Sequence, residues 1–395
     1  MKKGAAIPPG WQHVRLGEVA SIQTGIAKGA RKPRRPIMVP YLRVANVHAG
    51  RLDLREIKSI EVEESEVQRY LLRAGDVLMT EGGDFDKLGR GAVWRGEVST
   101  CLHQNHVFAV RPDPTRLLPE YLSLFTDSAH GRRYFQLSSK QSTNLASINS
   151  TQLKALPVLL PPLPLQERTM ALASTFDTAI EKADTLLAAK RRLKRALMQR
   201  LLASHADRPA DFQVMKAGEA FSERDERGMR ALPLLSVTGG RGVVARDDLE
   251  RRDTSSEDKS AYKRIVPGDI VYNTMRMWQG VCGLVVREGI VSPAYTVLVP
   301  AHGVSSRYCA HLFKQPRMIS LFRRYSQGLV DDTLNLKYSQ FSRIQLALPK
   351  PSDQERAASL LDRLDADIGT TADLLAALRL QKRGVMQKLL SGELQ

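Results

Sequence analysis

One stretch of sequence occurs twice in this chain, at a separation of 188 residues. Alignment of Gln166 with Gln354, continued to Leu202, gives 17 identical positions out of 37 without a gap. An ungapped match of about ten helical turns is typical of an internal duplication. The identical pairs include Asp177 with Asp365, Ile180 with Ile368, Leu186–Ala189 with Leu374–Ala377, Lys194 with Lys382, and Met198 with Met386. The repeat predicts two copies of one unit, each a globular segment followed by a long helix.

A weaker repeat precedes the strong one and keeps the same order along the chain. Residues 10–18 resemble residues 211–219, and residues 72–78 resemble residues 265–271. Between these anchors the two halves diverge. A shared scaffold that carries different loops is the pattern expected of two related modules that recognise different targets.

The excess of positive charge restricts the class of partner. The 395 residues carry a net charge of +17, which predicts an acidic partner: nucleic acid first, and an anionic membrane surface second. No apolar run approaches the ~20 residues that span a bilayer, and Met1-Lys2-Lys3-Gly4 is not followed by the apolar stretch of a secretory signal. The three cysteines are odd in number and far apart, which is typical of a reducing compartment. We expect a cytoplasmic protein that does not act on a membrane.

Hydrophobic patterning ahead of each long helix indicates a mixture of strands and helices. In the first half we expect strands at 41–47, after the turn at 75–76, and within 97–112, and a helix over 117–135. In the second half we expect strands at 269–273 and 290–300, and a helix over 306–324. The predicted fold class is therefore α/β (α+β), with two similar domains in tandem.

Apolar spacing predicts long helices over 165–204 and 353–391. Prolines at 157, 161, 162 and 164 end regular structure before the first helix. Most apolar residues lie three, four or seven positions apart, which places them in one stripe per helix. The stripes comprise Leu172, Phe176, Ile180, Ala183, Leu187, Leu193, Leu197 and Leu201 in the first helix, and Leu360, Leu364, Ile368, Leu375, Leu378, Val385 and Leu389 in the second. Matching stripes predict that the helices pair as an antiparallel coiled coil.

These features divide the chain into four segments: globular domains at 1–160 and 206–350, and helical segments at 161–205 and 351–395. At ~1.5 Å per residue each helix would be about 55 Å long, or roughly 16 base pairs of B-DNA at ~3.4 Å each. Such a pair would hold two DNA-reading modules about one to one and a half turns of DNA apart. The alternative is a duplication whose helices only pack the modules together.

Several short motifs occur in a fixed order within the repeat. The first half contains Pro9-Gly10-Trp11, Leu16–Val19, Ala74–Asp84 and Lys87–Gly91, and the second half contains Pro267–Asp269, Tyr272–Gly280 and Val291–Tyr295. Leu160–Gln166 opens the first long helix, whereas the second copy, Leu348–Gln354, lacks the Pro-Leu-Pro sequence. In this order the motifs resemble the specificity subunits of type I restriction–modification systems, over essentially the whole chain.

The resemblance implies a function and a set of partners. Residues 1–160 and 206–350 would be target-recognition domains, each reading half of a split, asymmetric sequence in double-stranded DNA, and the helices would fix the unread spacer. Two modification subunits would dock on the chain and methylate adenine N6 with S-adenosylmethionine. Restriction subunits would join and cleave with ATP and Mg. The chain itself would bind no cofactor and no metal.

The motifs of a catalytic chain are missing from the sequence. The double prolines, Pro8-Pro9 and Pro161-Pro162, are not followed by an aromatic residue, as an amino-methyltransferase loop requires, and no phosphate-binding loop occurs. The segment 101–106 and the residues His302, Cys309 and His311 do not have the spacing of a zinc site. Three alternatives stay open: a related methylation-only or phage-defence system, a stand-alone metal-dependent nuclease using acids such as Asp84, Asp86, Asp331 and Asp332, and a duplicated protein scaffold.

Candidate DNA contacts in the first half fall in three places. Residues 28–36 hold five cations among glycine and proline, which suits contact with phosphates, and include Arg31, Lys32, Arg34 and Arg35. Lys87 and Arg90 lie in a glycine-rich loop predicted to follow a strand. Gln104, Asn105 and His106 cluster groups that can read base edges. A solvated charge run and polar turns are the competing interpretations.

The second half has a corresponding set of candidates after its predicted strand at 269–273. Arg276 suits guanine, Gln279 suits adenine, and Trp278 can stack on a sugar or base. Tyr295, Lys337 and Tyr338 are further candidates. The alternative for Trp278 is a place in the hydrophobic core.

Overall fold

The computed structural model describes residues 7–27, 34–83, 88–141, 146–202, 212–229, 231–248 and 258–394. The chain divides into two compact units: unit 1 comprises residues 1–182 and 374–395, and unit 2 comprises residues 183–373. Two long helices, α5 (Leu163–Leu201) and α10 (Pro351–Ser391), each contribute one part to unit 1 and the other part to unit 2. Among the described helices, none is both long enough and apolar enough to cross a membrane.

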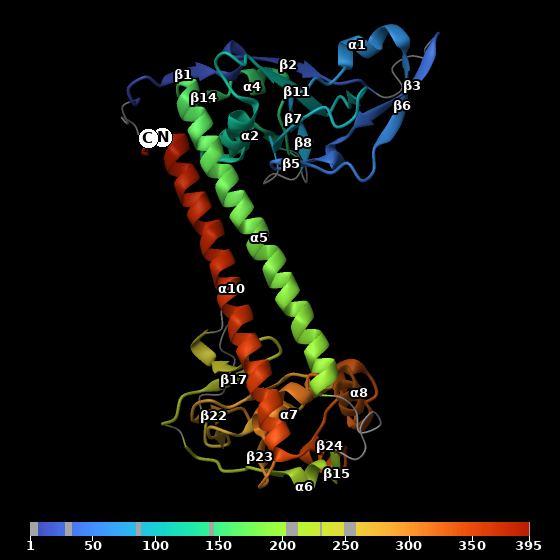
Figure 1. Cartoon of the computed structure of the whole chain (residues 1–395), viewed down its shortest axis with the longest axis vertical. Helices are drawn as coiled ribbons and strands as arrows, with labels where there is room; N and C mark the ends of the chain where they lie inside the picture. Colours follow the sequence, from blue (N-terminus) through green and yellow to red (C-terminus); the bar gives the residue numbers. More distant parts are fainter. Residues whose placement is uncertain are drawn as a thin grey trace. The chain divides into compact units, whose positions relative to one another are not determined.

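Unit 1 is built around an antiparallel sheet with the strand order β2-β11-β7-β9 (Figure 1). Its strands are β1 (Gln12–Arg15), β2 (Ala20–Thr24), β3 (Pro36–Leu42), β4 (Val47–His48), β5 (Arg51–Leu52), β6 (Lys58–Glu63), β7 (Val77–Thr80), β8 (Gly82–Gly83), β9 (Gly91–Val93), β10 (Leu102–His103), β11 (Val107–Pro112), β12 (Lys140–Gln141), β13 (Ala146–Ser147) and β14 (Pro157–Leu160). Its shorter helices are α1 (Val67–Tyr70), α2 (Pro119–Asp127), α3 (Ala129–Ser138) and α4 (Ser150–Lys154). A second sheet has the order β10-β3-β6.

Unit 2 has an antiparallel sheet with the order β16-β23-β20-β21. Its strands are β15 (Phe212–Lys216), β16 (Phe221–Glu223), β17 (Leu235–Thr238), β18 (Gly242–Ala245), β19 (Lys263–Ile265), β20 (Ile270–Asn273), β21 (Cys282–Leu284), β22 (Gly289–Val291), β23 (Tyr295–Pro300) and β24 (Gln345–Pro349). Its shorter helices are α6 (Ala217–Ala220), α7 (Ser306–Leu312), α8 (Pro316–Tyr325) and α9 (Tyr338–Phe341).

The two units share one topology, as the repeat predicts. Strands β2-β11-β7-β9 in unit 1 occupy the order of β16-β23-β20-β21 in unit 2. The strand that opens each unit pairs antiparallel with the strand just before a long helix, β1 with β14 and β15 with β24. Both β11 and β14 are followed by their counterparts at the repeat distance of 188 residues. The duplication therefore extends through the sheets.

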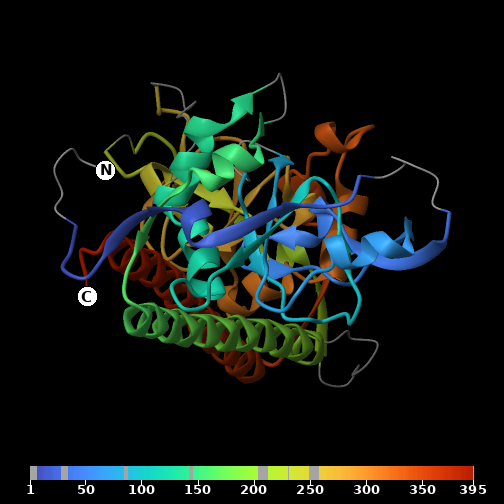
Figure 2. The ribbon, with the colours of Figure 1, turned by 90° about the horizontal axis from the view of Figure 1, so that it is seen from above.

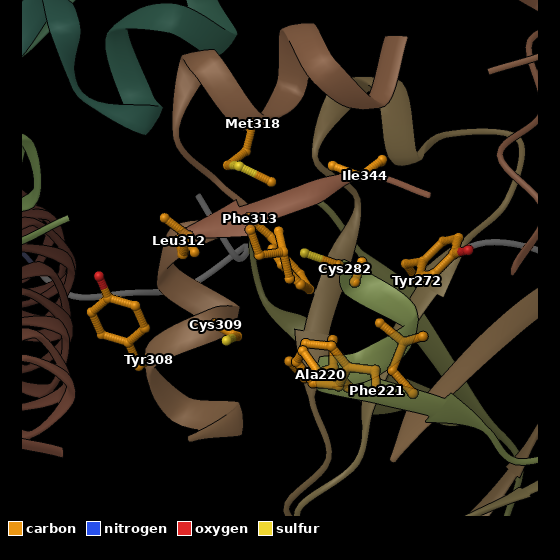
Figure 3. Packing of buried hydrophobic residues seen from close by; sticks show 14 of the residues in the cluster. Ala220, Phe221, Tyr272, Cys282, Tyr308, Cys309, Leu312, Phe313, Met318 and Ile344 are labelled. Atoms are coloured by element: carbon orange, nitrogen blue, oxygen red, sulfur yellow. The ribbon is translucent and has the colours of Figure 1, made fainter. Parts of the chain in front are cut away.

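Each unit has its own hydrophobic core against one face of its sheet. In unit 2 the core is rich in aromatic rings: Phe313 meets Phe322 and Phe341 edge-on, with centroids 5.5 and 5.8 Å apart. Figure 3 shows Phe313 packed beside Cys282. The corresponding core of unit 1 joins β7 and β11 to α2 and α3 through residues such as Phe108 and Phe125.

Repeated residues of opposite charge tie α5 to α10. In unit 1 Lys382 pairs with Asp177, and in unit 2 Lys194 pairs with Asp365. Each pair joins the first part of one helix to the last part of the other, so the helices run antiparallel in both units. Figure 2 shows them side by side. The predicted antiparallel pairing is therefore present, and each ion pair joins residues that are identical in the two copies of the repeat.

A repeated buried glutamine fixes the start of each long helix to its unit. Gln166 donates to the carbonyl oxygens of Arg116 and Pro161, at 2.8 and 2.9 Å, and accepts from the Leu118 amide at 2.9 Å. Gln354 donates to Gly303 and Pro349 and accepts from Ser305. The side chains are 0% and 2% exposed. This shared role explains why the strong repeat begins at this residue.

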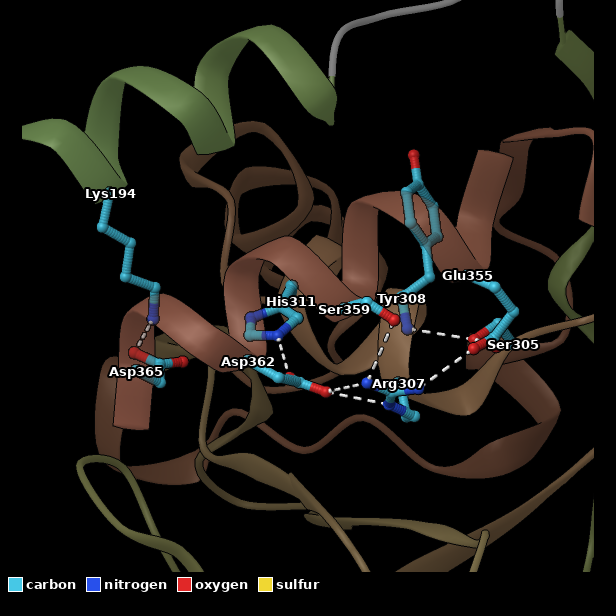
Figure 4. Close-up of polar contacts among 9 residues, drawn as sticks. All are labelled: Lys194, Ser305, Arg307, Tyr308, His311, Glu355, Ser359, Asp362 and Asp365. Atoms are coloured by element: carbon cyan, nitrogen blue, oxygen red, sulfur yellow. Dashed lines mark hydrogen bonds and ion pairs between the residues drawn. The ribbon is translucent and has the colours of Figure 1, made fainter. Parts of the chain in front are cut away.

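Unit 2 adds an ionic network between α7 and α10 (Figure 4). Arg307 pairs with Asp362 at 2.7 Å and with Glu355 at 3.1 Å, and the His311 Nε2 atom lies 2.7 Å from Asp362. Counting from the amide that meets the glutamine, His311 corresponds to Leu124 of unit 1. Unit 1 instead packs Leu124 with apolar residues of both long helices. The same helix contact is therefore polar in one unit and apolar in the other.

The structure corrects three predicted elements. The helix predicted over 117–135 is two helices, because Ser128 is extended and caps α3 by accepting from the Gly131 amide. The helix predicted over 306–324 is also two, because Gln315 is extended ahead of Pro316, as residues before proline tend to be. The strand predicted over 290–300 is interrupted by a turn in which the Tyr295 amide donates to Ser292.

The strand predicted over 41–47 is also shorter than expected. It ends at Leu42 and a turn of 3₁₀ helix follows over Val44–Asn46. The buried Asn46 side chain accepts from the Arg43 amide and donates to the carbonyl oxygens of Asp53 and Glu56. The apolar alternation was correctly detected, but a local side-chain bond competes successfully with the sheet.

Candidate nucleic-acid interface

In each unit three loops meet at the end of the third strand of the sheet, β7 or β20. They are the strand-end loop (81–90 or 274–280), the turn before the central strand (104–106 or 292–294), and the return loop that leads to α4 or α9 (139–149 or 326–337). In unit 1 the Glu81 amide donates to His106 and the Ile148 amide donates to Glu81, at 2.9 and 2.8 Å. In unit 2 the Thr274 amide donates to Ala294 and the Leu336 amide donates to Thr274. Equivalent backbone bonds thus assemble equivalent loops.

A buried aspartate supports the base of each assembly. Asp76 accepts two bonds of 2.7 Å from Arg111 and a third from the Arg73 amide. Asp269 accepts from Arg224 at 3.0 and 3.2 Å and from the Val266 amide. A bidentate guanidinium–carboxylate pair satisfies a carboxylate that burial would otherwise penalise. The two arginines come from different strands, so sequence alignment does not reveal their common role.

The turn that carries Gln104, Asn105 and His106 is held on both sides. The Asn105 amide donates to Ile26, and the Gln104 amide donates to Leu42. His106 is exposed, and its Nδ1 atom lies 2.6 Å from the Glu81 carboxylate. The neighbouring His103 is buried, its pKa is lowered by burial, and its Nδ1 atom meets the Val107 carbonyl oxygen at 2.6 Å. Gln104, Asn105 and His106 therefore stand on a fixed backbone, where their side chains can meet a ligand.

The other candidates of the first half are not all at this turn. Arg34 and Arg35 are exposed at the far end of β3, where their amides donate to Glu63. Six residues of β3 separate them from the strand end that pairs with β10, or about 20 Å at ~3.3 Å per residue. Arg90 is half-buried at the end of the strand-end loop. Arg31, Lys32 and Lys87 lie outside the described residues.

The strand-end loop of unit 2 presents Arg276, Trp278 and Gln279. Arg276 and Gln279 are exposed and Trp278 is half-buried. The indole Nε1 of Trp278 donates to the Met275 carbonyl oxygen at 3.1 Å, and the Arg323 guanidinium lies over the ring at 5.0 Å. Gly280 ends this loop with φ +76°, and a Cβ atom there would meet Ile319 of α8 at 3.1 Å. The loop is therefore seated on α8, with Trp278 at its edge.

A hollow of about 530 Å³ lies where the three loops of unit 2 meet. Its lining includes Thr274, Tyr295, Asn335, Lys337 and Tyr338. The Tyr338 hydroxyl donates to the Phe221 carbonyl oxygen at 2.7 Å, whereas Tyr295 is half-buried and Lys337 is exposed. The structure thus places Tyr295, Lys337 and Tyr338 around one cavity beside the loop that carries Arg276.

Sequence reasoning missed the return loops and Arg323. One signal was available: the spacing of 188 residues also relates Ile148 to Leu336, the buried residues that anchor the two return loops. Arg323 was interpreted only as a charge at the end of a helix. Its position over Trp278 depends on the packing of α8, which the sequence does not show.

The cysteines are buried away from these loops. Burial raises the pKa of Cys101 to about 12 and that of Cys282 to about 11, and Cys309 shifts in the same direction. Such thiols are unreactive parts of the core. Within the described ranges no three His, Cys, Asp or Glu side chains gather as a metal site would require.

Comparison with known proteins identifies the family of the first unit and its long helix. Residues 8–189 match the family described as "Type I restriction modification DNA specificity domain". The putative type I restriction enzyme MjaX specificity subunit of Methanocaldococcus jannaschii is 25% identical over 215 residues, 54% of this chain and 50% of that protein. The type I restriction enzyme EcoKI specificity subunit of Escherichia coli is 30% identical over 156 residues, 36% of this chain and 33% of that protein. The chain belongs to the type I restriction specificity subunits.

Solved structures extend the fold of these specificity subunits to the whole chain. The HsdS subunit of Thermoanaerobacter tengcongensis has a TM-score of 0.55 at 16% identity, covering 99% of both chains. The S subunit of M. genitalium has a TM-score of 0.56 at 12% identity, covering 98% of both. The sequence matches, by contrast, span half or less of the curated relatives' length. The two-unit fold is therefore shared with specificity subunits throughout.

Proposed function

We propose that this chain is the DNA-specificity subunit of a type I restriction–modification complex. It recognises a split, asymmetric target with two half-site readers and directs adenine N6 methylation and restriction by partner subunits. One observation carries the proposal: the same three loops are assembled by the same backbone bonds in both units, but they present different side chains. A shared scaffold with unlike loops suits a molecule that reads two different half-sites.

Within this proposal the chain recognises and does not catalyse. S-adenosylmethionine, ATP and Mg belong to the partner subunits, and double-stranded DNA is the ligand of the chain itself. The net charge of +17 supports a polyanionic ligand. Phosphate contacts from residues such as Arg34 and Arg35 would set affinity, and contacts from the loops to base edges would set sequence choice.

Exposed leucines on the long helices support two equivalent docking sites for modification subunits. Leu172 on α5 is 38% exposed in unit 1, and its repeat counterpart Leu360 on α10 is 42% exposed in unit 2. Conspicuous apolar side chains on an otherwise polar helix are typical of an interface. Because the repeat supplies the same residue twice, two copies of one partner can bind in the same way.

The spacer between the half-sites would be set by the helices. In both units α5 and α10 are joined by the ion pairs Lys382–Asp177 and Lys194–Asp365. A paired helix is stiffer than a single one, so its length can define a fixed unread interval. Restriction subunits would join the complex of this chain with the modification subunits.

Mapping of adenine methylation in cells tests the proposal. Cells carrying the chain and its neighbouring methyltransferase are compared with cells that lack only the chain. A split, non-palindromic methylated motif that disappears with the chain is expected, and it would also give both half-sites and the spacer. Unchanged methylation would contradict the proposal, and cleavage of DNA by the purified chain with a divalent metal would favour a nuclease instead.

A further inference from the structure

The tip of the return loop in unit 2 exposes two aliphatic side chains. Leu329 is 101% exposed and Val330 is 61% exposed, and Leu329 is the most exposed of the large hydrophobic residues in the described part of the chain. Leaving an aliphatic side chain in water forgoes about 1.5–3 kcal/mol of burial. Two adjacent residues of this kind at the end of one loop indicate a contact surface.

The loop that carries the tip has a defined shape. The backbones of Gln327 and Asn335 donate to each other at 2.9 and 2.8 Å. Val330 accepts from both the amide and the hydroxyl of Thr333, each at 2.9 Å. Gly328 has φ +144°, and a Cβ atom there would come within 2.6 Å of the Thr333 carbonyl oxygen. The tip is therefore preorganised, which lowers the entropic cost of binding.

The same loop is joined to the candidate DNA-reading residues. The Leu336 amide donates to the Thr274 carbonyl oxygen, at the start of the strand-end loop that carries Arg276. Arg323 lies over the Trp278 ring and pairs with Asp331, which directly follows the tip. Trp278, Arg323 and the tip thus form one connected surface.

The charge around the tip favours a polyanion over an apolar protein surface. Arg276, Arg323, Arg324 and Lys337 are exposed on the elements that hold the tip. Against these four cations the tip region has two carboxylates, Asp331 and Asp332, and Asp331 is already paired with Arg323. An aliphatic tip within a cationic rim fits DNA, in which the thymine methyl group of the major groove is the apolar mark.

We propose that Leu329 and Val330 form an apolar reader that contacts a thymine methyl group in the half-site recognised by unit 2. This inference rests on the proposed function and adds to it a second mode of readout beside the polar side chains of Arg276 and Gln279. The corresponding sequence in the first half is Ser142-Thr143-Asn144-Leu145, which is mostly polar. The two half-sites would therefore be read by different chemistry at this position.

Uracil substitution tests the contact, because uracil is thymine without the methyl group. The chain, with its methyltransferase partner, is titrated with duplexes of the mapped target in which each thymine of the half-site is replaced in turn. For the wild type we expect about fourfold weaker binding at one position, which corresponds to about one buried methyl group. The variant L329S/V330S should bind the thymine duplex about fourfold more weakly and show no further loss with uracil.

The control is V286S, which removes another exposed aliphatic side chain (72% exposed) from unit 2 and should leave the response to uracil unchanged. A wild type that does not respond to uracil at any position, or a double variant that still does, would overturn the inference while sequence-specific binding remained. Absence of preference for any split site would instead count against the proposed function. Loss of partner binding in L329S/V330S with an unchanged response to uracil would also overturn the inference, because the tip would then be a protein contact.

Discussion

Individual buried polar residues connect the repeat to the loops that would read DNA. Gln166 and Gln354 each satisfy three backbone groups at the base of a long helix. Asp76 and Asp269 each receive an arginine and a backbone amide beneath the strand-end loop. These side chains hold the scaffold constant, whereas the exposed loop residues above them differ between the units. Scaffold and recognition thus depend on different residues.

Replacement of either glutamine with alanine should destabilise its unit. Q166A or Q354A leaves two buried carbonyl oxygens and one amide without their partner, which we expect to lower the free energy of unfolding by about 2–3 kcal/mol. Chemical denaturation measures the change. The exposed neighbour Glu167 provides the control, because E167A should alter stability by less than about 0.5 kcal/mol. Equal effects of Q166A and E167A would contradict the role assigned to the glutamine.

Arg276 and the pair Arg34 and Arg35 should affect DNA binding differently. R276A should relax base choice at one position of one half-site by ~1–3 kcal/mol. R34A/R35A should weaken binding to all sequences and lower the salt slope by roughly two. Titrations of cognate and mismatched duplexes at several salt concentrations distinguish these effects, with R287A as an exposed control in unit 2. If both variants keep the affinity and salt dependence of the wild type, these contacts are placed wrongly.

At the scale of elements, the repeat preserves topology while the helix contacts diverge. In unit 2 the α7–α10 contact holds His311, Arg307 and Asp362, and in unit 1 the same place is apolar. Burial lowers the pKa of His311 although Asp362 opposes the shift. Burial would raise the pKa of Asp362, but hydrogen bonds from His311 and Arg307 bring it below its usual value. Both groups hold fewer protons in the folded state than in the unfolded state.

Unit 2 should therefore lose stability in mild acid more steeply than unit 1. A group with a lowered folded pKa contributes stability that is present above its unfolded pKa and lost as pH falls. For His311 the loss begins near its usual pKa of 6.5 and should reach at most about tenfold per pH unit in the opening equilibrium. Hydrogen exchange of α7 amides, with α2 amides as internal reference, measures it. H311L, which introduces the residue type of Leu124, should remove the difference, and its persistence in H311L would argue against the assignment.

Element prediction succeeded where the pattern is local and failed where a tertiary contact intervenes. Both long helices are present because their apolar periodicity extends over many turns. The helix expected over 117–135 is divided because Ser128 caps α3, and the strand expected over 41–47 is shortened because Asn46 bonds to Asp53 and Glu56. Of the candidate site, Arg276, Trp278 and Gln279 were found from their place after a strand. Arg323 and the Leu329–Val330 tip were not found, because α8 and the return loop bring them to that surface.

For the whole molecule, duplication means that one partner type can meet two equivalent surfaces. L172E and L360E change repeat counterparts in different units, so each should remove about one of two modification subunits. Native mass spectrometry of the complex measures this stoichiometry. L137E, at a 76% exposed leucine on α3, should retain both copies. Retention of both copies by L172E and by L360E would place docking elsewhere.

The sequence by itself determined the duplication, the two long helices and the basic character of the chain. These are recorded in residue identity at a fixed spacing, in helical periodicity and in net charge, none of which requires knowledge of distant contacts. Only the tertiary structure decided which loops meet. The bonds that join Glu81 to Ile148 and Thr274 to Leu336 link residues more than sixty positions apart. Such pairings depend on the order of strands in a sheet, and a one-dimensional pattern carries no measure of that order.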